Sequence, residues 1–194
     1  MAFDLPTAVE KIEQQLPKDI PTTAWPVLFM ISGLPGTGKS YLSRRLAERV
    51  SAVIIETDRI RKTLFDPPTY SAKESERVHR VAHQLIERLL RKGVRVIFDA
   101  TNLVEFQRET VYHIADRLGA KLVIIRTTAP EEVVRERLAR RKERTDEQDV
   151  SDADWNVYKR MRRRQQGFRR NFLVIDTSDD IDAAIAKIIR MARR

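Results

Sequence analysis

The residues whose types and spacing could do chemistry begin with a glycine-rich stretch at 33–40, which reads Gly-Leu-Pro-Gly-Thr-Gly-Lys-Ser. Its glycines let the backbone turn and bring N–H groups up to phosphate oxygens. Lys39 can reach the β- and γ-phosphates as a point charge, and the Ser40 hydroxyl can ligate Mg²⁺. The stretch therefore predicts a nucleoside triphosphate site, with ATP and Mg²⁺ as the expected cofactors. The predicted nucleotide-binding residues are Gly33, Gly36, Thr37, Gly38, Lys39 and Ser40.

Two carboxylates, Asp58 and Asp99, lie at or just after the ends of apolar runs. Asp99 could hold Mg²⁺ opposite Ser40, or it could be a capping or loop residue. Asp58 could be the general base that takes the proton of a hydroxyl acceptor as its oxygen attacks the γ-phosphorus. Arg61 is three residues on, hence on the same helix face, and could bind an anionic substrate group. The alternative for this pair is that Thr57 or Asp58 merely caps a helix and Arg61 is solvated.

A basic segment later in the chain offers candidates for stabilising the charge that develops in phosphoryl transfer. Arg140 and Arg144 lie about one helical turn apart, ahead of a polar segment at 145–150. Arg137 and Arg141 form a parallel pair. The alternative for most of this cluster is a solvated basic face.

Two further residue types could serve a site. His79 and His83 are spaced i,i+4, as a zinc-binding pair can be, but Arg80 follows His79 where the zinc-protease motif has Glu and no third ligand is evident. We therefore predict no zinc site. Among aromatic residues that could stack on a nucleobase, Tyr70 beside the substrate-side loop is the predicted substrate contact, with ordinary packing as the alternative.

The elements that must position these residues follow from hydrophobic periodicity. Apolar runs predict strands at 27–31, 52–56, 94–99, 120–126 and 172–176. The glycine-rich stretch lies between the first strand and a helix at 41–50, and its alternative reading is an ordinary strand–helix turn. Apolar strands separated by helices indicate an α/β fold with a five-stranded parallel sheet covered on both faces. In such a sheet, ligand-binding and catalytic residues lie at the carboxyl ends of the strands.

The chain divides into two parts by composition. Residues 1–26 predict a short helix and a Pro-rich connector, which we expect to cover one edge of the sheet. Residues 27–194 predict a single domain with an Arg-rich lid at about 137–152. We find no internal repeat and no linker long enough to separate two domains.

Composition limits the class of protein. The 194 residues are 42% hydrophobic, which is enough for a full core, and the absence of cysteine excludes disulfides and thiolate metal sites. The apolar runs are too short to cross a bilayer and the N-terminus lacks a signal-peptide pattern, so we expect a cytoplasmic protein with no membrane partner. A formal net charge of +9 suggests a polyanionic partner such as nucleic acid, or simply a basic protein that handles phosphate.

Taken together, these motifs resemble the small P-loop kinases related to polynucleotide 5′-kinase, over about residues 27–176. The resemblance implies a P-loop NTPase fold, with Asp58 as the general base and Arg61 as the contact to the acceptor's phosphate. The run at 98–103 is similar to the Asp-Thr-Asn element of these enzymes, which makes Thr101 and Asn102 predicted substrate contacts. By spacing, Arg144 matches the lid arginine that contacts donor phosphates, with Arg140 as a second candidate.

The leading hypothesis is an ATP- and Mg²⁺-dependent kinase whose acceptor is the 5′-hydroxyl of a polynucleotide. Relatives of the same architecture, including zeta toxins and chloramphenicol phosphotransferases, act on small hydroxyl compounds, so a small-molecule kinase is the alternative. A nucleotide-dependent nucleic-acid-binding module without transfer is the non-enzyme alternative. The predicted catalytic residues are Asp58, Lys39, Arg144 and Arg140.

Overall fold

A five-stranded parallel sheet forms the centre of the molecule. The computed structural model describes residues 3–143 and 153–193. The strands lie in the order β2-β3-β1-β4-β5. Their bounds are β1 (Val27–Ser32), β2 (Val53–Glu56), β3 (Val96–Asp99), β4 (Lys121–Thr128) and β5 (Leu173–Asp176). All five predicted strands and their parallel arrangement are confirmed, with ends that differ by one or two residues.

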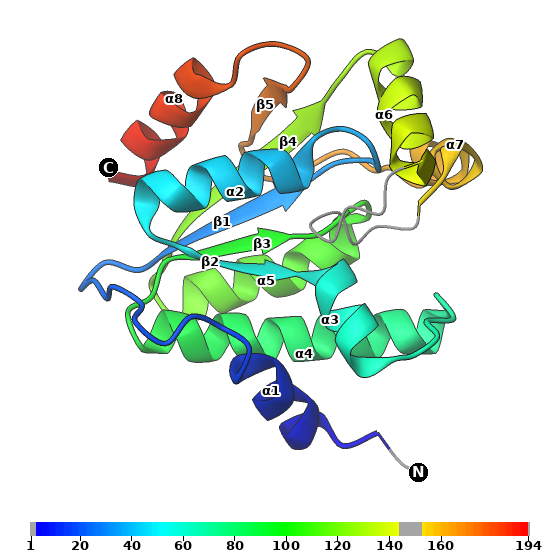
Figure 1. Cartoon of the computed structure of the whole chain (residues 1–194). Coiled ribbons are helices and arrows are strands. Elements are labelled where there is room, and N and C mark those ends of the chain that lie inside the picture. The colour runs from blue at the N-terminus through cyan, green and yellow to red at the C-terminus, as the bar shows by residue number, and fades with distance from the viewer. Residues whose placement is uncertain (1–2, 144–152, 194) are drawn as a thin grey trace.

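Eight helices accompany the sheet within the described residues. Figure 1 shows α2 and α8 on one face of the sheet, α4 and α5 on the other, and α6 and α7 beyond the carboxyl ends of the strands. The bounds are α1 (Leu5–Glu13), α2 (Lys39–Val50), α3 (Thr57–Leu64), α4 (Ala72–Arg91), α5 (Glu105–Arg117), α6 (Glu131–Glu143), α7 (Trp155–Arg164) and α8 (Asp182–Arg193). None of these helices is long and apolar enough to cross a bilayer.

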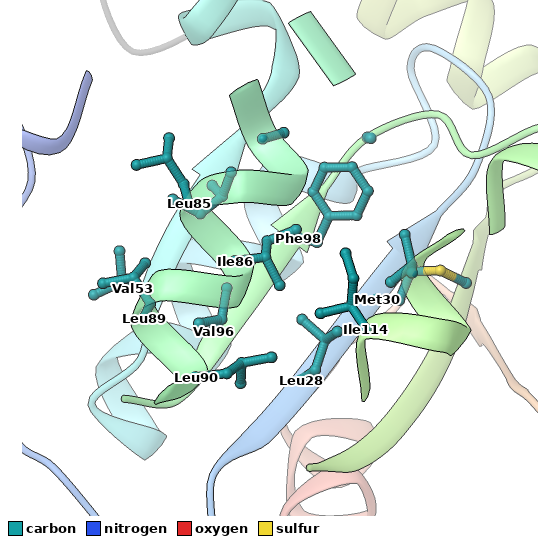
Figure 2. Close-up of a cluster of buried hydrophobic side chains, with 14 of the residues drawn as sticks. Leu28, Met30, Val53, Leu85, Ile86, Leu89, Leu90, Val96, Phe98 and Ile114 are labelled. Carbon is teal, nitrogen blue, oxygen red and sulfur yellow. The ribbon is translucent and has the colours of Figure 1, made fainter. Parts of the chain in front are cut away.

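The core has one cluster on each face of the sheet, because successive strand side chains point to opposite faces. In β1, Leu28 and Met30 join the cluster beneath α4 and α5, whereas Phe29 and Ile31 join the cluster beneath α2 and α8. Figure 2 shows the first cluster, in which leucines of α4 pack over β2 and β3. Burial on both faces explains why these strands read as continuous apolar runs.

The register of the central strands aligns the ends that carry the polar residues. Asp99 at the end of β3 pairs with Ile31 of β1 on one side and with Glu56 of β2 on the other. The carboxyl ends of β1, β2 and β3 therefore lie at the same level, and α2 and α3 begin directly beyond this level.

We expect the N-terminal piece to cover one edge of the sheet, but in the structure its helix packs on other helices. Helix α1 is capped by Asp4 and packs mainly against α4 and α3, placing Ala8, Val9 and Ile12 in the core cluster. Helix α1 therefore adds to the layer of helices on the α4 side of the sheet (Figure 1). The connector meets the sheet region at Thr22, which forms an antiparallel bridge with Val94, and at Pro26, whose carbonyl accepts a hydrogen bond from the Lys121 N–H at 3.0 Å.

One local alternative near the site, the helix cap at Thr57 or Asp58, is not what the structure shows. Thr57 and Asp58 lie within the first turn of α3, and Glu56 occupies the capping position without a side-chain cap hydrogen bond. Helix α5 begins at Glu105, three residues after Asn102, whose positive φ of 45° lies outside the helical region. Ser71 caps α4: its side chain accepts a hydrogen bond from the Glu74 backbone N–H.

Candidate functional site

A cavity of about 1360 Å³ opens at the carboxyl edge of the sheet. Its walls come from the glycine-rich loop, the ends of β2 and β3, and helices α3, α4, α5, α6 and α7, together with the loop after β5. Elements far apart in sequence are therefore brought to one concave surface, as is usual for this class of sheet. The predicted site residues that line it are Gly36, Gly38, Lys39, Ser40, Asp58, Arg61, Tyr70, Asp99, Thr101 and Arg140.

The glycine-rich loop forms a tight cradle at one end of the cavity. Gly36 and Gly38 have φ values of 78° and 77°, which non-glycine residues rarely adopt. A Cβ at Gly38 would lie 2.5 Å from Thr177 Oγ1, and one at Gly36 would lie 2.9 Å from Val134 Cγ1. The loop leads into α2, whose first turn has no side-chain cap, so its backbone N–H groups remain suited to an anion.

Gly33 and Thr37 hold this loop in place and do not line the cavity. The Gly33 N–H donates to the Thr101 carbonyl at 3.2 Å. The Thr37 hydroxyl is buried and donates to the Leu34 carbonyl at 2.7 Å. Both were predicted to contact nucleotide; in this structure their contacts are internal to the protein, because each faces the sheet instead of the cavity.

Lys39 lies between the loop and the strand ends. Its ammonium donates to the Leu34 carbonyl at 3.1 Å and is attracted to Asp99 and Asp58. Burial lowers the pKa of Lys39, while these carboxylates oppose the shift. Burial likewise raises the pKa of Asp99, and attraction to Lys39 opposes that shift. Lys39, Asp58 and Asp99 thus act on one another electrostatically across the cavity wall.

Oxygen donors suited to Mg²⁺ meet beside Lys39. The Ser40 hydroxyl donates to Glu56 Oε1 at 3.4 Å, and Ser40 is also among the groups that oppose the rise in the pKa of Asp99. Asp99 Oδ2 also accepts a hydrogen bond from Ser43 at 2.9 Å. Mg²⁺ prefers such oxygens and commonly takes only one or two protein ligands, completing its shell with water and phosphate. This donor set fits Mg²⁺, and no group of three or more His, Cys, Asp or Glu in the described residues offers a complete protein cage.

Glu56 is a site residue that sequence reasoning missed. It ends β2 in register with Asp99 and lines the cavity. Burial raises the pKa of Glu56 to about 7, and the charges of Asp99 and Asp58 add to this shift. The available signal was its position as the last residue of an apolar strand, which is also the position of Asp99.

Asp58 and Arg61, the pair predicted to bind and activate the acceptor, both line the cavity, but the charge of Arg61 is met by another side chain. Arg61 is buried and forms an ion pair with Glu74 of α4, while its Nη2 lies 3.2 Å from Ser75 Oγ. The Tyr70 ring covers the Arg61 guanidinium at 4.8 Å. Burial tends to raise the pKa of Glu74, but hydrogen bonds from Thr69, Arg61 and Tyr70 outweigh it and lower the value to about 2. Asp58, by contrast, lines the cavity in the first turn of α3.

The arginines of α6 occupy different environments. Arg137 donates to the Thr177 carbonyl at 2.7 Å and to the Gly36 carbonyl at 3.3 Å, so it ties the loop to the segment after β5. Arg140 is exposed and forms an ion pair with Glu136 at 2.6 Å. Arg141 lines the cavity, and its charge lowers the pKa of Lys39. Arg144, the predicted donor contact, lies outside the described residues, as does most of the predicted lid.

His79 and His83 line the cavity from α4, which their spacing alone did not show. Their ring centroids are 5.7 Å apart, and both rings meet Phe98 edge-on. Burial lowers the pKa of each to about 4, so both imidazoles are neutral near pH 7. Neutral imidazoles can donate or accept a hydrogen bond without favouring an anionic ligand.

The run after β3 contributes less to the cavity than we predicted. Thr101 lines it, but Asn102 is fully buried and donates its side-chain N–H to the Ile31 carbonyl at 3.0 Å. The expectation that Asn102 contacts substrate is therefore corrected: its side chain fastens the loop to β1.

The sequence of the chain matches a known protein family. A family model described as AAA domain (AAA_33) matches residues 28–168. The uncharacterized protein Rv2004c of Mycobacterium tuberculosis is 31% identical over 126 residues, which are 59% of this chain and 25% of that protein. The chain thus matches a quarter of the length of its curated relatives.

Two solved structures share the architecture. Kti12 from Chaetomium thermophilum, in complex with ADP-AlF3, has a TM-score of 0.66 and 22% identity over 84% of this chain and 95% of that chain. The APS kinase CysC of Mycobacterium tuberculosis, in complex with AMPPNP and APS, has a TM-score of 0.64 and 18% identity over 90% of this chain and 100% of that chain. At these identities the likeness establishes the fold, which is that of P-loop NTPases.

Proposed function

The chain belongs to the AAA_33 family of AAA domains, and on that premise we propose that it transfers the γ-phosphate of ATP to a hydroxyl acceptor. The observation that carries the proposal is the meeting of Lys39, Asp58 and Asp99 on one cavity wall, where both carboxylates act on the lysine. Nucleotide binding alone explains Lys39 and Asp99. Asp58 provides the additional carboxylate that transfer to a hydroxyl requires.

The loop and its surroundings are suited to hold the donor. The phosphates would be bound by Lys39 and by backbone N–H groups of the loop and of the start of α2. Gly36 and Gly38 have no room for a side chain, so the loop backbone can fold tightly around the phosphates. Ser40 and Asp99 would hold Mg²⁺, which neutralises phosphate charge when bound. Arg141 lines the same cavity and would add positive charge near the transferred group.

The proposed reaction is a direct displacement at phosphorus. The acceptor oxygen forms a bond to the γ-phosphorus while the bond from that phosphorus to the β–γ bridging oxygen breaks, and ADP leaves with the bonding electrons. The hydroxyl proton passes to the carboxylate of Asp58. Lys39 and Arg141 stabilise negative charge on the transferred group as it moves.

A polynucleotide 5′-hydroxyl is the first candidate acceptor. It is supported by exposed arginines on the cavity wall, Arg80 of α4 with Arg160 and Arg164 of α7. The net charge of +9 also favours a polyanionic acceptor such as a polynucleotide. Arg61 supports this acceptor less than its sequence position suggested, because its charge is already met by Glu74.

A small hydroxyl compound is the second candidate, and the ion pair between Arg61 and Glu74 favours it. A neutral acceptor needs no unpaired cation beside Asp58. The neutral His79 and His83 also present hydrogen-bonding groups to the cavity without a requirement for acceptor charge.

Incubation with γ-labelled ATP, Mg²⁺ and a panel of hydroxyl acceptors tests the proposal. We expect label in either a 5′-hydroxyl oligonucleotide or a small alcohol, and the recipient decides between the two acceptors. If nucleotide binds but no panel member gains label and oligonucleotides bind tightly in a salt-sensitive way, the transfer proposal is wrong and a binding role replaces it.

A further inference from the structure

Phe106 is an exposed aromatic residue on the wall of the cavity. It is the second residue of α5, its exposed fraction is 80%, and it lines the cavity that also holds Lys39 and Asp58. A single exposed apolar residue on an outer surface requires no explanation. On a cavity wall, the same exposure leaves a large flat ring available to a ligand.

Buried side chains on either side of Phe106 hold the first turn of α5 in place. Arg108 is fully buried and donates from Nε to Glu105 Oε2 at 2.7 Å and from Nη1 to the Asn102 carbonyl at 2.8 Å. It also lies 4.1 Å from the centre of the Phe168 ring. Glu105 and Arg108 share one face of α5 and fasten it to the protein, which leaves Phe106 on a different face.

The same network joins the start of α5 to the segment after α7. The Gln166 N–H donates to the Leu103 carbonyl at 2.9 Å, and Gln166 Oε1 accepts from the Glu105 N–H at 2.9 Å. The start of α5, which carries Phe106, is therefore held to the segment after α7 by hydrogen bonds.

Apolar and polar residues both line the cavity near Phe106, the polar ones on α5 being Gln107 and Thr110. Leu103 and Val104 precede Phe106 in the chain, while Val157 and Met161 lie one turn apart on α7, and all four line the cavity. An accessible aromatic face is suited to a planar ring, which gains from stacking as well as from burial. A flexible open-chain polyol would gain little from such a surface.

We propose that Phe106 forms a ring subsite, in which a planar aromatic ring of the acceptor stacks on its side chain. The inference rests on the proposed function and specifies its acceptor as a hydroxyl compound that carries a planar ring. A nucleobase at the end of a polynucleotide and the ring of a small aromatic alcohol share this chemistry, and the test below separates them.

Two pairs of probes test the subsite by direct binding in the presence of ADP and Mg²⁺. Thymidine is compared with methyl 2-deoxyribofuranoside, which lacks the base, and 3-phenyl-1-propanol with 3-cyclohexyl-1-propanol, whose ring is not planar. Ligand-observed NMR titration gives each Kd. We expect the planar member of one pair to bind roughly tenfold more tightly, and that pair identifies the source of the ring.

Variants assign the preference to Phe106. Phe106→Ala is expected to remove most of the preference and Phe106→Trp to keep it, while the affinity for ADP stays the same. Trp25→Ala is the matched control, since Trp25 is also an exposed aromatic residue (82%) but does not line the cavity. Equal binding within both pairs, no binding of either planar probe at millimolar concentration, or an unchanged preference in Phe106→Ala would overturn the ring subsite.

The outcome for the ring subsite is distinct from the outcome for the reaction. Label transfer to acceptors irrespective of a planar ring would remove the subsite and leave the phosphotransferase intact. A Phe106-dependent ring preference with no transfer to any ringed alcohol would instead overturn the proposed function, together with the role of the ring as part of an acceptor.

Discussion

The guanidinium of Arg61 is ion-paired with the carboxylate of Glu74 inside the cavity wall, and the Tyr70 ring lies over it. Glu74 also accepts a hydrogen bond from the Thr69 N–H at 2.8 Å, so one carboxylate orders both Arg61 and the turn between α3 and α4. The pair holds Arg61 in the wall of the cavity that Asp58 also lines, and it largely cancels the charge of Arg61. Any acceptor that needs this arginine must compete with Glu74.

Removing the charge of Glu74 is expected to destabilise the protein. Glu74→Gln leaves the buried Arg61 without a counter-charge, and we expect the free energy of unfolding to fall by about 2–4 kcal/mol. Urea denaturation at pH 7 measures the change. The control is Glu109→Gln, which breaks the more exposed pair with Arg169 at 3.0 Å and is expected to cost less than about 1 kcal/mol. Similar losses in the two variants would mean that the buried pair contributes no more than a surface pair.

Replacing Asp58 is expected to separate nucleotide binding from transfer. Asp58→Asn retains the size of the side chain but removes the proton acceptor, so kcat for transfer should fall by at least about 100-fold while ATP affinity changes little. Labelled-phosphate transfer and equilibrium ATP binding measure the two effects. Asp182→Asn is the control, because Asp182 also lies in the first turn of a helix but pairs with Arg45 outside the cavity. Full transfer activity in Asp58→Asn would exclude Asp58 as the base.

The two neighbouring arginines of α6 are expected to differ in their effect on transfer. Both line the cavity, but Arg141 acts on Lys39 electrostatically, whereas the charge of Arg140 is met by an ion pair with Glu136. We expect Arg141→Ala to lower kcat at least about tenfold more than Arg140→Ala, because charge near the transferred phosphoryl group stabilises the transition state. Steady-state kinetics of both variants with one acceptor decide the point. A larger loss in Arg140→Ala would reverse the assignment.

The sheet and the nucleotide side of the site could be predicted because their signals are local. An apolar run ending in a glycine-rich loop or in Asp99 identifies a strand and its functional end without knowledge of partners. The parallel arrangement then follows from the alternation of strands and helices. Asp58 could be identified in the same way, because it comes two residues after the second strand ends.

The partners of these residues could not be predicted, because they depend on long-range packing. Nothing in the sequence identified Glu74 as the partner of Arg61, because the two residues lie on different helices. Glu56 carries no motif, and only the register of β2 against β3 brings it level with Asp99. The face of α4 that bears His79 reads as an ordinary part of an amphipathic helix until the cavity is known.

The raised pKa of Glu56, about 7, predicts a specific pH dependence of stability. Between the usual value of 4.5 and 7, the folded protein keeps a proton on Glu56 that the unfolded chain has released, so stability from this group falls as pH rises through that range. His79 and His83, with pKa values near 4, have the opposite effect and add stability as pH rises from 4 to 6.5. A variant of Glu56 alone is therefore needed to isolate its contribution.

Glu56→Gln keeps a neutral side chain at every pH and removes the cost of ionising a buried carboxylate beside Asp99. Relative to wild type, we expect it to gain about 1–2 kcal/mol of unfolding free energy on going from pH 5 to pH 8, less than the ~3 kcal/mol of the full shift because Glu56 is only partly buried. Urea denaturation without nucleotide or Mg²⁺ measures this difference, and Glu48→Gln, on the exposed side of α2, provides the control. If Glu56→Gln and wild type lose or gain stability in parallel across this range, Glu56 is already ionised at pH 5 and the crowding of carboxylates around Ser40 is weaker than the structure indicates.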